Sequence, residues 1–180
     1  MSDYISFHNH TKYSILDSLI DVKDLFAKAK QLNQSAIAIT DHATLAAAHD
    51  GLLASKSSGV KLIMGCEFYF VDDLQSPNVD SQKLKHIILC AKNYNGYKNL
   101  LMLLKEANDN NILHFKKLFP RIDWNILEKY SKDLICTTAC GSGIIGSLLN
   151  NRKIEEAKKN LSLAKDIYRK NEALAKKLKG

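Results

Sequence analysis

The sequence predicts an α/β fold, with strands and helices alternating around a sheet that is either open or closed into a barrel. Over the first 150 residues, short apolar segments alternate with segments of helical periodicity, a pattern typical of parallel strands joined by helices. Residues 35–40 are apolar without alternation, as expected for a strand covered on both faces. Histidines and carboxylates recur near the ends of these strands, where such folds gather their active sites.

Hydrophobic periodicity and capping residues set the boundaries of the expected elements. The segment after Asp21 has its apolar residues on one helical face, and Asp21 is a suitable N-cap. Asp123 likewise precedes a helical segment, Gly65 interrupts a long strand, and a polar loop contains Pro77. We expect strands at 4–8, 35–40, 60–70, 87–91 and 134–138, and helices at 21–32, 44–57, 96–107, 123–130 and, as one helix or two, 152–179.

Length and composition indicate a soluble globular protein. The 180 residues are 46% hydrophobic and 25% charged, which is ordinary for a single domain. No apolar run approaches the roughly 18–20 residues of a membrane span, and the N-terminus lacks a signal-peptide pattern, so we expect a cytoplasmic location and no membrane association. The four cysteines show no C-x-x-C spacing, so reduced, mostly buried thiols are expected rather than a disulfide scaffold or zinc ribbon.

The formal charge of +7 is unevenly distributed along the chain. Residues 1–150 hold 16 Lys and Arg against 15 Asp and Glu, whereas residues 151–180 hold 10 against 4. We therefore divide the chain into a domain over residues 1–150 and a basic helical tail over residues 151–180. Such a tail can contact nucleic acid or can simply be a solvated helical face, and both interpretations stay open.

Candidate metal ligands recur along the chain. His8 and His10 form an H-x-H pair after the first expected strand, where both imidazoles point to the same side. His86 stands at the beginning of its strand, so topology alone does not place it with the others. Imidazole and carboxylate donors suit Zn, Mn or Fe, and a multi-metal site of this kind supports phosphoester hydrolysis. The seven candidate ligands are His8, His10, Asp17, His42, Glu67, His86 and Cys140.

Each candidate taken singly has a simpler explanation. A lone histidine at a strand end is usually a hydrogen-bonded structural residue, and Cys140 before a glycine turn is typical of a small core residue. Their recurrence at successive strand ends favours a shared site. His49 and His114 have no such placement, so we expect surface or core residues there. Residues 141–143 are not followed by a phosphate-loop pattern, and there is no G-x-S-x-G motif.

The segment from His8 to Asp17 resembles the opening motif of the PHP (polymerase and histidinol phosphatase) domain. It is most similar to the version at the N-terminus of bacterial DNA polymerase III alpha subunits, and the resemblance covers about residues 4–160. It implies a distorted (β/α)7 barrel with a cleft for two or three divalent metal ions. Further stretches that match in order are 36–42, 65–67, 86–93, 96–100, 120–123 and 134–140.

The resemblance implies a role for each candidate ligand. In chain order it assigns them to the H-x-H pair, the acidic ligand of the following loop, the histidine after the second strand, the bridging carboxylate, the next histidine and the cysteine of polymerase-type members. It also implies that Asp41, beside His42, supports the site without binding metal. Arg121 is a candidate contact for a substrate phosphate, or equally forms a structural salt bridge. We expect catalysis to depend on His8, His10, Glu67 and His86.

The chain departs from the family pattern in two ways. Lys12 stands where an acidic residue is common, and Ser18 and Ala43 stand where glycine is common, but none of these is an expected ligand. The family continues with a strand and an Asn-Asp-x-His-like motif that supplies a final Asp and His. Nothing follows Gly180, so we expect an incomplete barrel that lacks its C-terminal strands and two ligands.

These observations predict a PHP-domain module of the polymerase III alpha family, acting in DNA replication. In that family the cleft supports metal-dependent phosphoester hydrolysis, which in some members is 3′→5′ exonuclease proofreading. The expected partners are DNA and the remainder of the polymerase or other replisome subunits. The palm, fingers and thumb are absent, so the chain alone cannot polymerise, and whether it hydrolyses phosphoesters stays open at this stage.

Two alternatives stand beside this hypothesis. The chain could be a non-catalytic split or truncated polymerase fragment that serves as a structural or assembly module with a separate polymerase chain. An open barrel leaves an unpaired strand edge, which favours association. The other alternative is a gene fragment without function.

Overall fold

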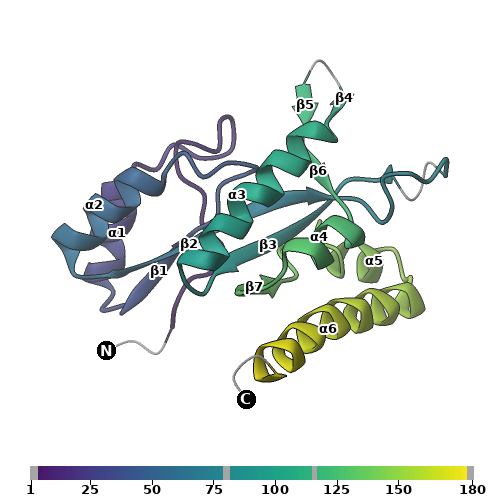
Figure 1. Cartoon of the computed structure of the whole chain (residues 1–180). Coiled ribbons are helices and arrows are strands. Elements are labelled where there is room, and N and C mark those ends of the chain that lie inside the picture. Colours follow the sequence, from purple (N-terminus) through teal and green to yellow (C-terminus); the bar gives the residue numbers. More distant parts are fainter. Residues whose placement is uncertain (1–3, 79–81, 115–116, 178–180) are drawn as a thin grey trace.

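The computed structural model describes residues 4–78, 82–114 and 117–177 and shows a mixed α/β fold (Figure 1). A five-stranded sheet has β1, β2, β3 and β7 side by side, with β6 also paired to β2, and β4 and β5 form a separate hairpin. The elements are α1 (Val22–Gln31), β1 (Ala36–Ile39), α2 (Ala48–Ser58), β2 (Lys61–Phe70), β3 (Lys85–Ala91), α3 (Tyr94–Asp109), β4 (Ile112–His114), β5 (Lys117–Phe119), β6 (Arg121–Ile122), α4 (Trp124–Tyr130), β7 (Leu134–Thr137), α5 (Gly146–Asn150) and α6 (Ile154–Lys177).

Strand β2 is the long central member of the sheet, and it changes partner at Gly65. Its residues 61–64 pair in parallel with β1, and its residues 65–70 pair antiparallel with β3. The expected interruption at Gly65 is therefore wrong, since the strand continues through it. A Cβ at this position would lie 2.7 Å from the Cys90 sulfur and 2.8 Å from the Leu89 carbonyl oxygen, so only glycine fits this close approach of the two strands.

Strand β3 runs antiparallel to both β2 and β7. The expectation of a parallel sheet is wrong for this strand. The described parts of the β2–β3 connection contain no α-helix, and a parallel neighbour requires a long crossover, usually a helix. The reversed direction places His86, near the start of β3, opposite Tyr69, near the carboxyl end of β2. A residue at the beginning of a strand thus reaches the edge of the sheet where the other strands end.

Residues 4–8 do not form the strand expected there, although the segment runs beside β1. The backbone N–H of Ala38 donates to the Ser6 carbonyl oxygen and that of Thr40 donates to the Asn9 carbonyl oxygen, both at 3.0 Å. The Asn9 side chain also donates to the Ala38 carbonyl oxygen at 2.9 Å. These bonds hold the N-terminal segment against the outer edge of β1. The hairpin β4–β5, the short strand β6 and helix α5 were not expected from the sequence.

Most of the expected helices are present, and two begin at the expected caps. Helix α1 follows Asp21, whose carboxylate accepts a hydrogen bond from the Lys23 N–H. Helix α4 follows Asp123, which accepts from the Ile126 N–H at 3.0 Å. Helix α2 begins at Ala48, four residues later than expected. The C-terminal segment is one long helix, α6.

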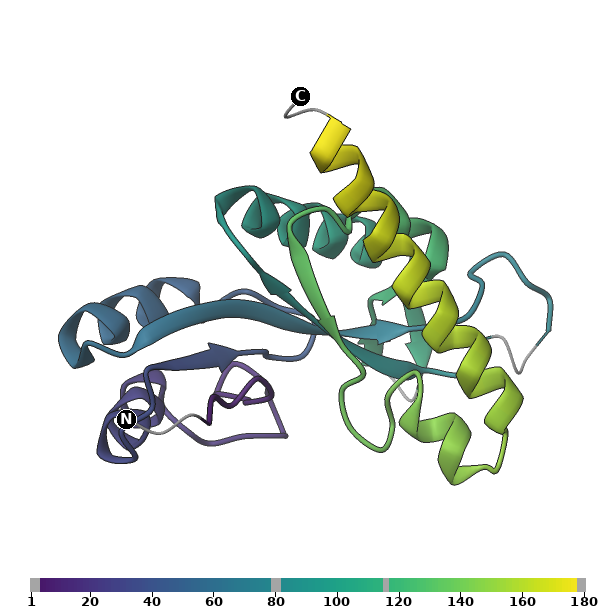
Figure 2. The same cartoon turned by 90° about the horizontal axis from the view of Figure 1, so that it is seen from below.

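The hydrophobic core consists of two main clusters that hold the ends of the strands in place. The larger cluster lies among β2, β3, β6, α3 and α4 and includes Phe68, Phe70, Leu89 and Leu103. The second packs α1 and α2 against β1 and includes Phe26, whose complete burial stabilises the fold by about 1.5–3 kcal/mol. Helices α1 and α2 therefore flank β1 on one side of the molecule. Helix α6 lies beside β7 on the other side (Figures 1 and 2).

None of the helices within the described residues is long and apolar enough to cross a membrane.

The division into residues 1–150 and 151–180 rests on composition and stays a prediction. Helix α6 buries Ala157 and Ile167, and its Tyr168 packs against the larger core cluster.

Candidate metal centre

The seven candidate ligands lie together. They line one open hollow with a volume of about 330 Å³. Three of them lie in the N-terminal segment and the loop that follows it. The other four come from the loop after β1, from β2, from β3 and from the turn after β7. The lining residues are His8, His10, Asp17, His42, Glu67, His86 and Cys140.

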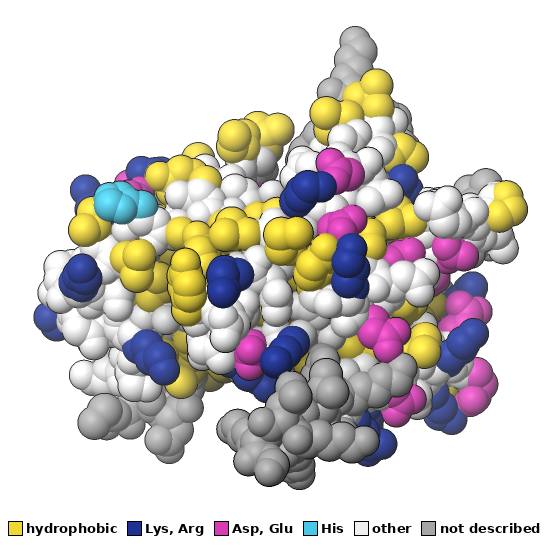
Figure 3. Space-filling view, viewed as in Figure 1, with side chains coloured by type: hydrophobic (Ala, Val, Ile, Leu, Met, Phe, Trp, Pro, Cys, Tyr) yellow, Lys and Arg dark blue, Asp and Glu magenta, His cyan; other side chains and the backbone are white. Residues whose placement is uncertain are grey.

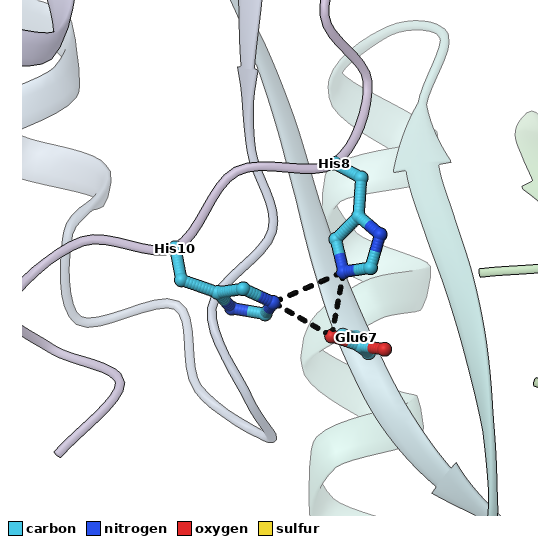
Figure 4. Close-up of side chains that lie close together, drawn as sticks. All are labelled: His8, His10 and Glu67. Atoms are coloured by element: carbon cyan, nitrogen blue, oxygen red, sulfur yellow. Dashed lines mark hydrogen bonds and ion pairs between the residues drawn. The ribbon is translucent and has the colours of Figure 1, made fainter. Parts of the chain in front are cut away.

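Glu67 is the centre of this cluster, and its side chain is only 1% exposed. One carboxylate oxygen, Oε2, lies 3.0 Å from His8 Nε2 and 2.9 Å from His10 Nε2 (Figure 4). His42 Nδ1 is 3.5 Å from the same oxygen, and His86 Nδ1 is 2.9 Å from Oε1. Four imidazoles therefore converge on one buried carboxylate.

The electrostatics of this cluster favour an ionised Glu67. Burial by itself would raise its pKa, but hydrogen bonds from His10 and His86 and the nearby His42 hold the pKa of Glu67 well below its usual range. Burial lowers the pKa of His10, yet its contact with Glu67 outweighs this, so the net pKa of His10 is raised. Burial lowers the pKa of His42. The site thus combines a permanent negative charge with imidazoles of differing basicity.

The donor atoms fit a divalent metal centre. His8 Nε2 and His10 Nε2 lie 3.0 Å apart while facing the same oxygen of Glu67, and a cation between such groups relieves the repulsion of their lone pairs. Buried His42 Nδ1 lies 3.5 Å from Glu67 Oε2 and has no hydrogen-bond partner among the described residues, which is costly for a polar atom without a ligand. Nitrogen and carboxylate oxygen donors together suit Zn, Mn or Fe.

The ligand atoms form three overlapping groups, each with its atoms within 4.8 Å of one another. Glu67, His10 and His42 each belong to two of them, so neighbouring groups share a donor residue. The groups are His8–His10–Glu67, His10–Asp17–His42 and His42–Glu67–His86.

Asp17 and Cys140 lie at the rim of the hollow. Asp17 Oδ2 is 3.4 Å from His42 Nε2 and 3.7 Å from His10 Nδ1, and its side chain is 47% exposed. The Cys140 sulfur lies 4.0 Å from His86 Nδ1 and is exposed. Both side chains are therefore free to adjust to a bound ion in a way that buried Glu67 is not.

A family model of the PHP domain matches residues 6–175. The chain belongs to the PHP domain family. This confirms the resemblance seen in the opening motif and in the stretches that follow it.

Curated relatives of this PHP domain are named DNA polymerase III subunit alpha. The protein from Borreliella burgdorferi is 38% identical over 93% of this chain, and that from Chlamydia muridarum is 34% identical over 93%. The protein from Aquifex aeolicus is 32% identical over 92%. The chain spans only 14%, 13% and 15% of these three relatives, respectively.

Two solved structures share part of the fold. One, from Bifidobacterium adolescentis, is provisionally named a metal-dependent phosphoesterase, with a TM-score of 0.45 and 22% identity over 60% of this chain and 34% of that one. The other is an amidohydrolase from Chromobacterium violaceum with bound sulfate and no metal, with a TM-score of 0.41 and 17% identity over 58% of this chain and 32% of that one. Similarity this distant supports no argument about activity.

Asp41 lies beside the candidate metal centre, and its side chain accepts hydrogen bonds from the loop that joins His10 to Asp17. Asp41 Oδ1 accepts from the Thr11 backbone N–H at 2.6 Å and from the Ser14 hydroxyl at 2.8 Å, and Oδ2 accepts from the Thr11 hydroxyl at 2.8 Å. Sequence reasoning did not single out Thr11 and Ser14. The available signal was two small hydroxyl residues placed between the ligands of one loop.

Tyr69 is a second residue that sequence reasoning did not identify. Its ring stacks on His42 with centroids 5.7 Å apart, and it meets His86 edge-on at 5.5 Å. Burial raises the pKa of Tyr69, so its hydroxyl stays neutral beside Glu67. The Tyr69 ring therefore restricts the orientations of the His42 and His86 imidazoles.

Two of three further residues singled out from the sequence lie apart from the hollow. Arg121 does not line it; its guanidinium donates to the Asn110 carbonyl oxygen at 3.1 Å and to Gln82 Oε1 at 2.6 Å. His49 is an exposed residue of α2. The side chain of His114 lies outside the part of the chain that the structure describes.

Half of the six non-glycine residues with positive φ among the described residues lie next to candidate ligands. Three non-glycine residues with positive φ directly adjoin Asp17, His42 or Cys140 in the chain. This conformation costs about 1–2 kcal/mol for a residue with a Cβ, and such strain persists where the surrounding structure enforces it. Each sharp turn redirects the chain as it enters or leaves a ligand. The residues are Leu16 (φ 70°), Ala43 (φ 49°) and Ala139 (φ 56°).

Proposed function

We propose that this PHP domain binds two or three divalent ions, Zn, Mn or Fe, and hydrolyses phosphoesters. The observation that carries the proposal is the convergence of four imidazoles on the buried carboxylate of Glu67. Divalent ions bound in such a site supply activation of a water molecule and neutralise charge that develops on the phosphate and the leaving oxygen.

The candidate ligands would hold the ions in groups. His8, His10 and Glu67 would hold one ion, and His42, Glu67 and His86 would hold a second. His10, Asp17 and His42 form the third group of donors. Cys140 would complete the site from the rim.

The proposed substrate is a phosphodiester at a DNA 3′ end. The hollow is open, and side chains that line it, such as His8 at 33% exposure, are reachable from solvent. Kinship to DNA polymerase III alpha subunits supports DNA, other replisome subunits and the remainder of a polymerase as partners, and supports the cytoplasm as location. The role of the basic helix α6 on DNA stays a prediction. Lys158 of α6 pairs with Glu155, and Lys153, which directly precedes the helix, pairs with Glu156.

The test begins with the metal content of the purified chain, measured by elemental mass spectrometry. We expect two or more ions per chain in the wild type and in His49→Ala, which changes an exposed histidine outside the hollow. Glu67→Gln keeps the shape of the side chain but removes its charge, and it should carry less than one ion.

Hydrolysis of a 3′-labelled single-stranded oligonucleotide should follow the same order among the three proteins. Full metal content together with wild-type hydrolysis in Glu67→Gln would contradict the proposal. Full metal content in the wild type without hydrolysis would support metal binding and reject the enzyme.

A second candidate function is the assembly module with a separate polymerase chain. The observation that favours it is a broad, largely apolar hollow of about 740 Å³ between α2 and α3, over β2. Hydrophobic side chains gather on this face (Figure 3). Its lining includes Phe7, Leu52, Leu62, Met64, Tyr94 and Tyr97.

Exposed apolar surface that gathers on one face commonly marks an interface. Light scattering separates the two functions, because an assembly module without its partner should self-associate. A monomer that keeps its metal and its hydrolysis would exclude this second reading.

A further inference from the structure

The hydroxyl of Ser14 contacts three groups of the metal centre at once. It lies 2.8 Å from Asp41 Oδ1, 3.1 Å from the backbone nitrogen of His42 and 3.1 Å from His10 Nδ1. Ser14 and Asp41 are buried, at 2% and 1% exposure, so these contacts are shielded from competing water.

The direction of each hydrogen bond follows from the chemistry of the partners. An ionised carboxylate only accepts, so the single hydroxyl proton of Ser14 is donated to Asp41. The backbone N–H of His42 only donates, so it uses one lone pair of the Ser14 oxygen. What Ser14 still offers to His10 is a second lone pair. The contact between Ser14 and His10 is therefore a hydrogen bond only when His10 Nδ1 carries the proton.

We propose that Asp41 and Ser14 fix the tautomer of His10, with the proton on Nδ1 and the lone pair of Nε2 directed at the metal centre. The inference deepens the proposed function, since it rests on His10 being a metal ligand. His10 Nε2 is the nitrogen that faces Glu67 at 2.9 Å. Free neutral histidine favours the opposite tautomer, with the proton on Nε2, and in the metal-free chain ionised Glu67 also accepts a hydrogen bond from Nε2. The assigned tautomer is therefore that of the metal-bound chain, in which an ion would replace the proton on Nε2. Ser14 and Asp41 are thus positioning residues.

One other acceptor is near His10 Nδ1. The carboxylate of Asp17 lies 3.7 Å away and is 47% exposed, whereas Ser14 is closer and buried. As a candidate ligand itself, Asp17 would turn toward an ion. Ser14 is then the acceptor left for the proton on Nδ1, and the same arrangement raises the basicity of a ligating imidazole.

The tautomer is measured directly by long-range ¹H–¹⁵N NMR of the imidazole rings in the full chain loaded with zinc. We expect His10 to show a protonated Nδ1 and an unprotonated Nε2. A wild-type His10 with its proton on Nε2 overturns the proposal without the need for any variant. This readout is independent of hydrolysis, so its failure and the failure of the proposed function are distinguishable.

The variants Ser14→Ala and Thr11→Val separate positioning from general stability. Both remove one hydroxyl hydrogen bond to buried Asp41, but only Ser14 contacts His10. We expect Ser14→Ala to lower zinc affinity about 10- to 100-fold. Thr11→Val should keep both the wild-type tautomer and the wild-type affinity. An equal loss of zinc affinity in the two variants, or a wild-type zinc affinity in Ser14→Ala, would reject the assignment.

Discussion

The Nε2 atoms of His8 and His10 lie 3.0 Å apart, and both face the same oxygen of Glu67. Two residues that are one position apart in an extended segment normally direct their side chains to the same side. The buried carboxylate of β2 then draws both rings to one point (Figure 4). This relationship is the smallest unit of the proposed metal centre.

Metal affinity should fall as the pH falls from about 8 to 6. The contact with Glu67 raises the pKa of His10 above the usual value of 6.5, so near neutral pH an ion must displace a proton from this ring. Affinity therefore weakens as the pH falls below the raised pKa and levels off above it. Glu67 does not compete, because its pKa is held well below its usual range.

Calorimetric zinc titrations at several pH values, in buffers of different ionisation enthalpy, would measure both the affinity and the protons released. His49→Ala should behave as the wild type. A zinc affinity that stays constant across this pH range would show that His10 does not bind the ion.

Cys140 should be the one thiol that a reagent labels rapidly in the native protein. It is exposed, whereas burial raises the pKa of Cys90 and of Cys136 to about 12 and that of Cys66 further still. Because the thiolate is the reactive form, these three should react only on unfolding. Absorbance of the thiol reagent DTNB would count one fast thiol, and Cys140→Ser would remove it.

Zinc should slow the labelling of Cys140 if this residue is a ligand. The matched comparison is Glu67→Gln, in which zinc should give little protection. Equal labelling rates with and without zinc in the wild type would remove Cys140 from the proposed ligand set.

Ala43→Gly should stabilise the protein by about 0.5–1 kcal/mol. Ala43 has φ 49°, where a Cβ costs about 1–2 kcal/mol. Glycine relieves this strain, but part of the stabilisation is offset because glycine has more conformational freedom in the unfolded chain. Chemical denaturation would measure the change.

The control is Ala46→Gly, in the same connection but without positive φ. It should lose stability, because it pays the entropy cost of glycine without relief of strain. A loss of stability in Ala43→Gly as large as in Ala46→Gly would mean that the turn after His42 is not strained.

Gly65→Ala should destabilise the fold by about 1–3 kcal/mol, as overpacking does in a close-packed core. The new methyl group would lie 2.7 Å from the Cys90 sulfur and 2.8 Å from the Leu89 carbonyl oxygen, so the pairing of β2 with β3 must shift. Gly141→Ala is the control, since its Cβ would lie 3.4 Å from the nearest atom, in the Asn150 side chain. Thermal unfolding should show a lower midpoint for Gly65→Ala alone.

Residue type and spacing were sufficient to select the candidate ligands. The H-x-H pair, Glu67 after Gly65 and a cysteine before a glycine turn are local patterns, and the side-chain periodicity of extended chain is visible without coordinates. Helix starts such as those after Asp21 and Asp123 were equally local, because an N-cap acts on the first turn of its own helix. The roles of the ligands stay predictions until metal binding is measured.

Long-range pairing decided the rest. The sequence by itself determined which donor types are available and roughly where strands and helices begin. Only the tertiary structure decided that β3 runs antiparallel to β2, which brings His86 to the edge where Glu67 stands. It also decided that Asp41 acts on His10 through Ser14, across 27 residues of sequence. Strand direction and buried hydrogen bonds depend on which distant segments meet, and local propensity carries no information about that choice.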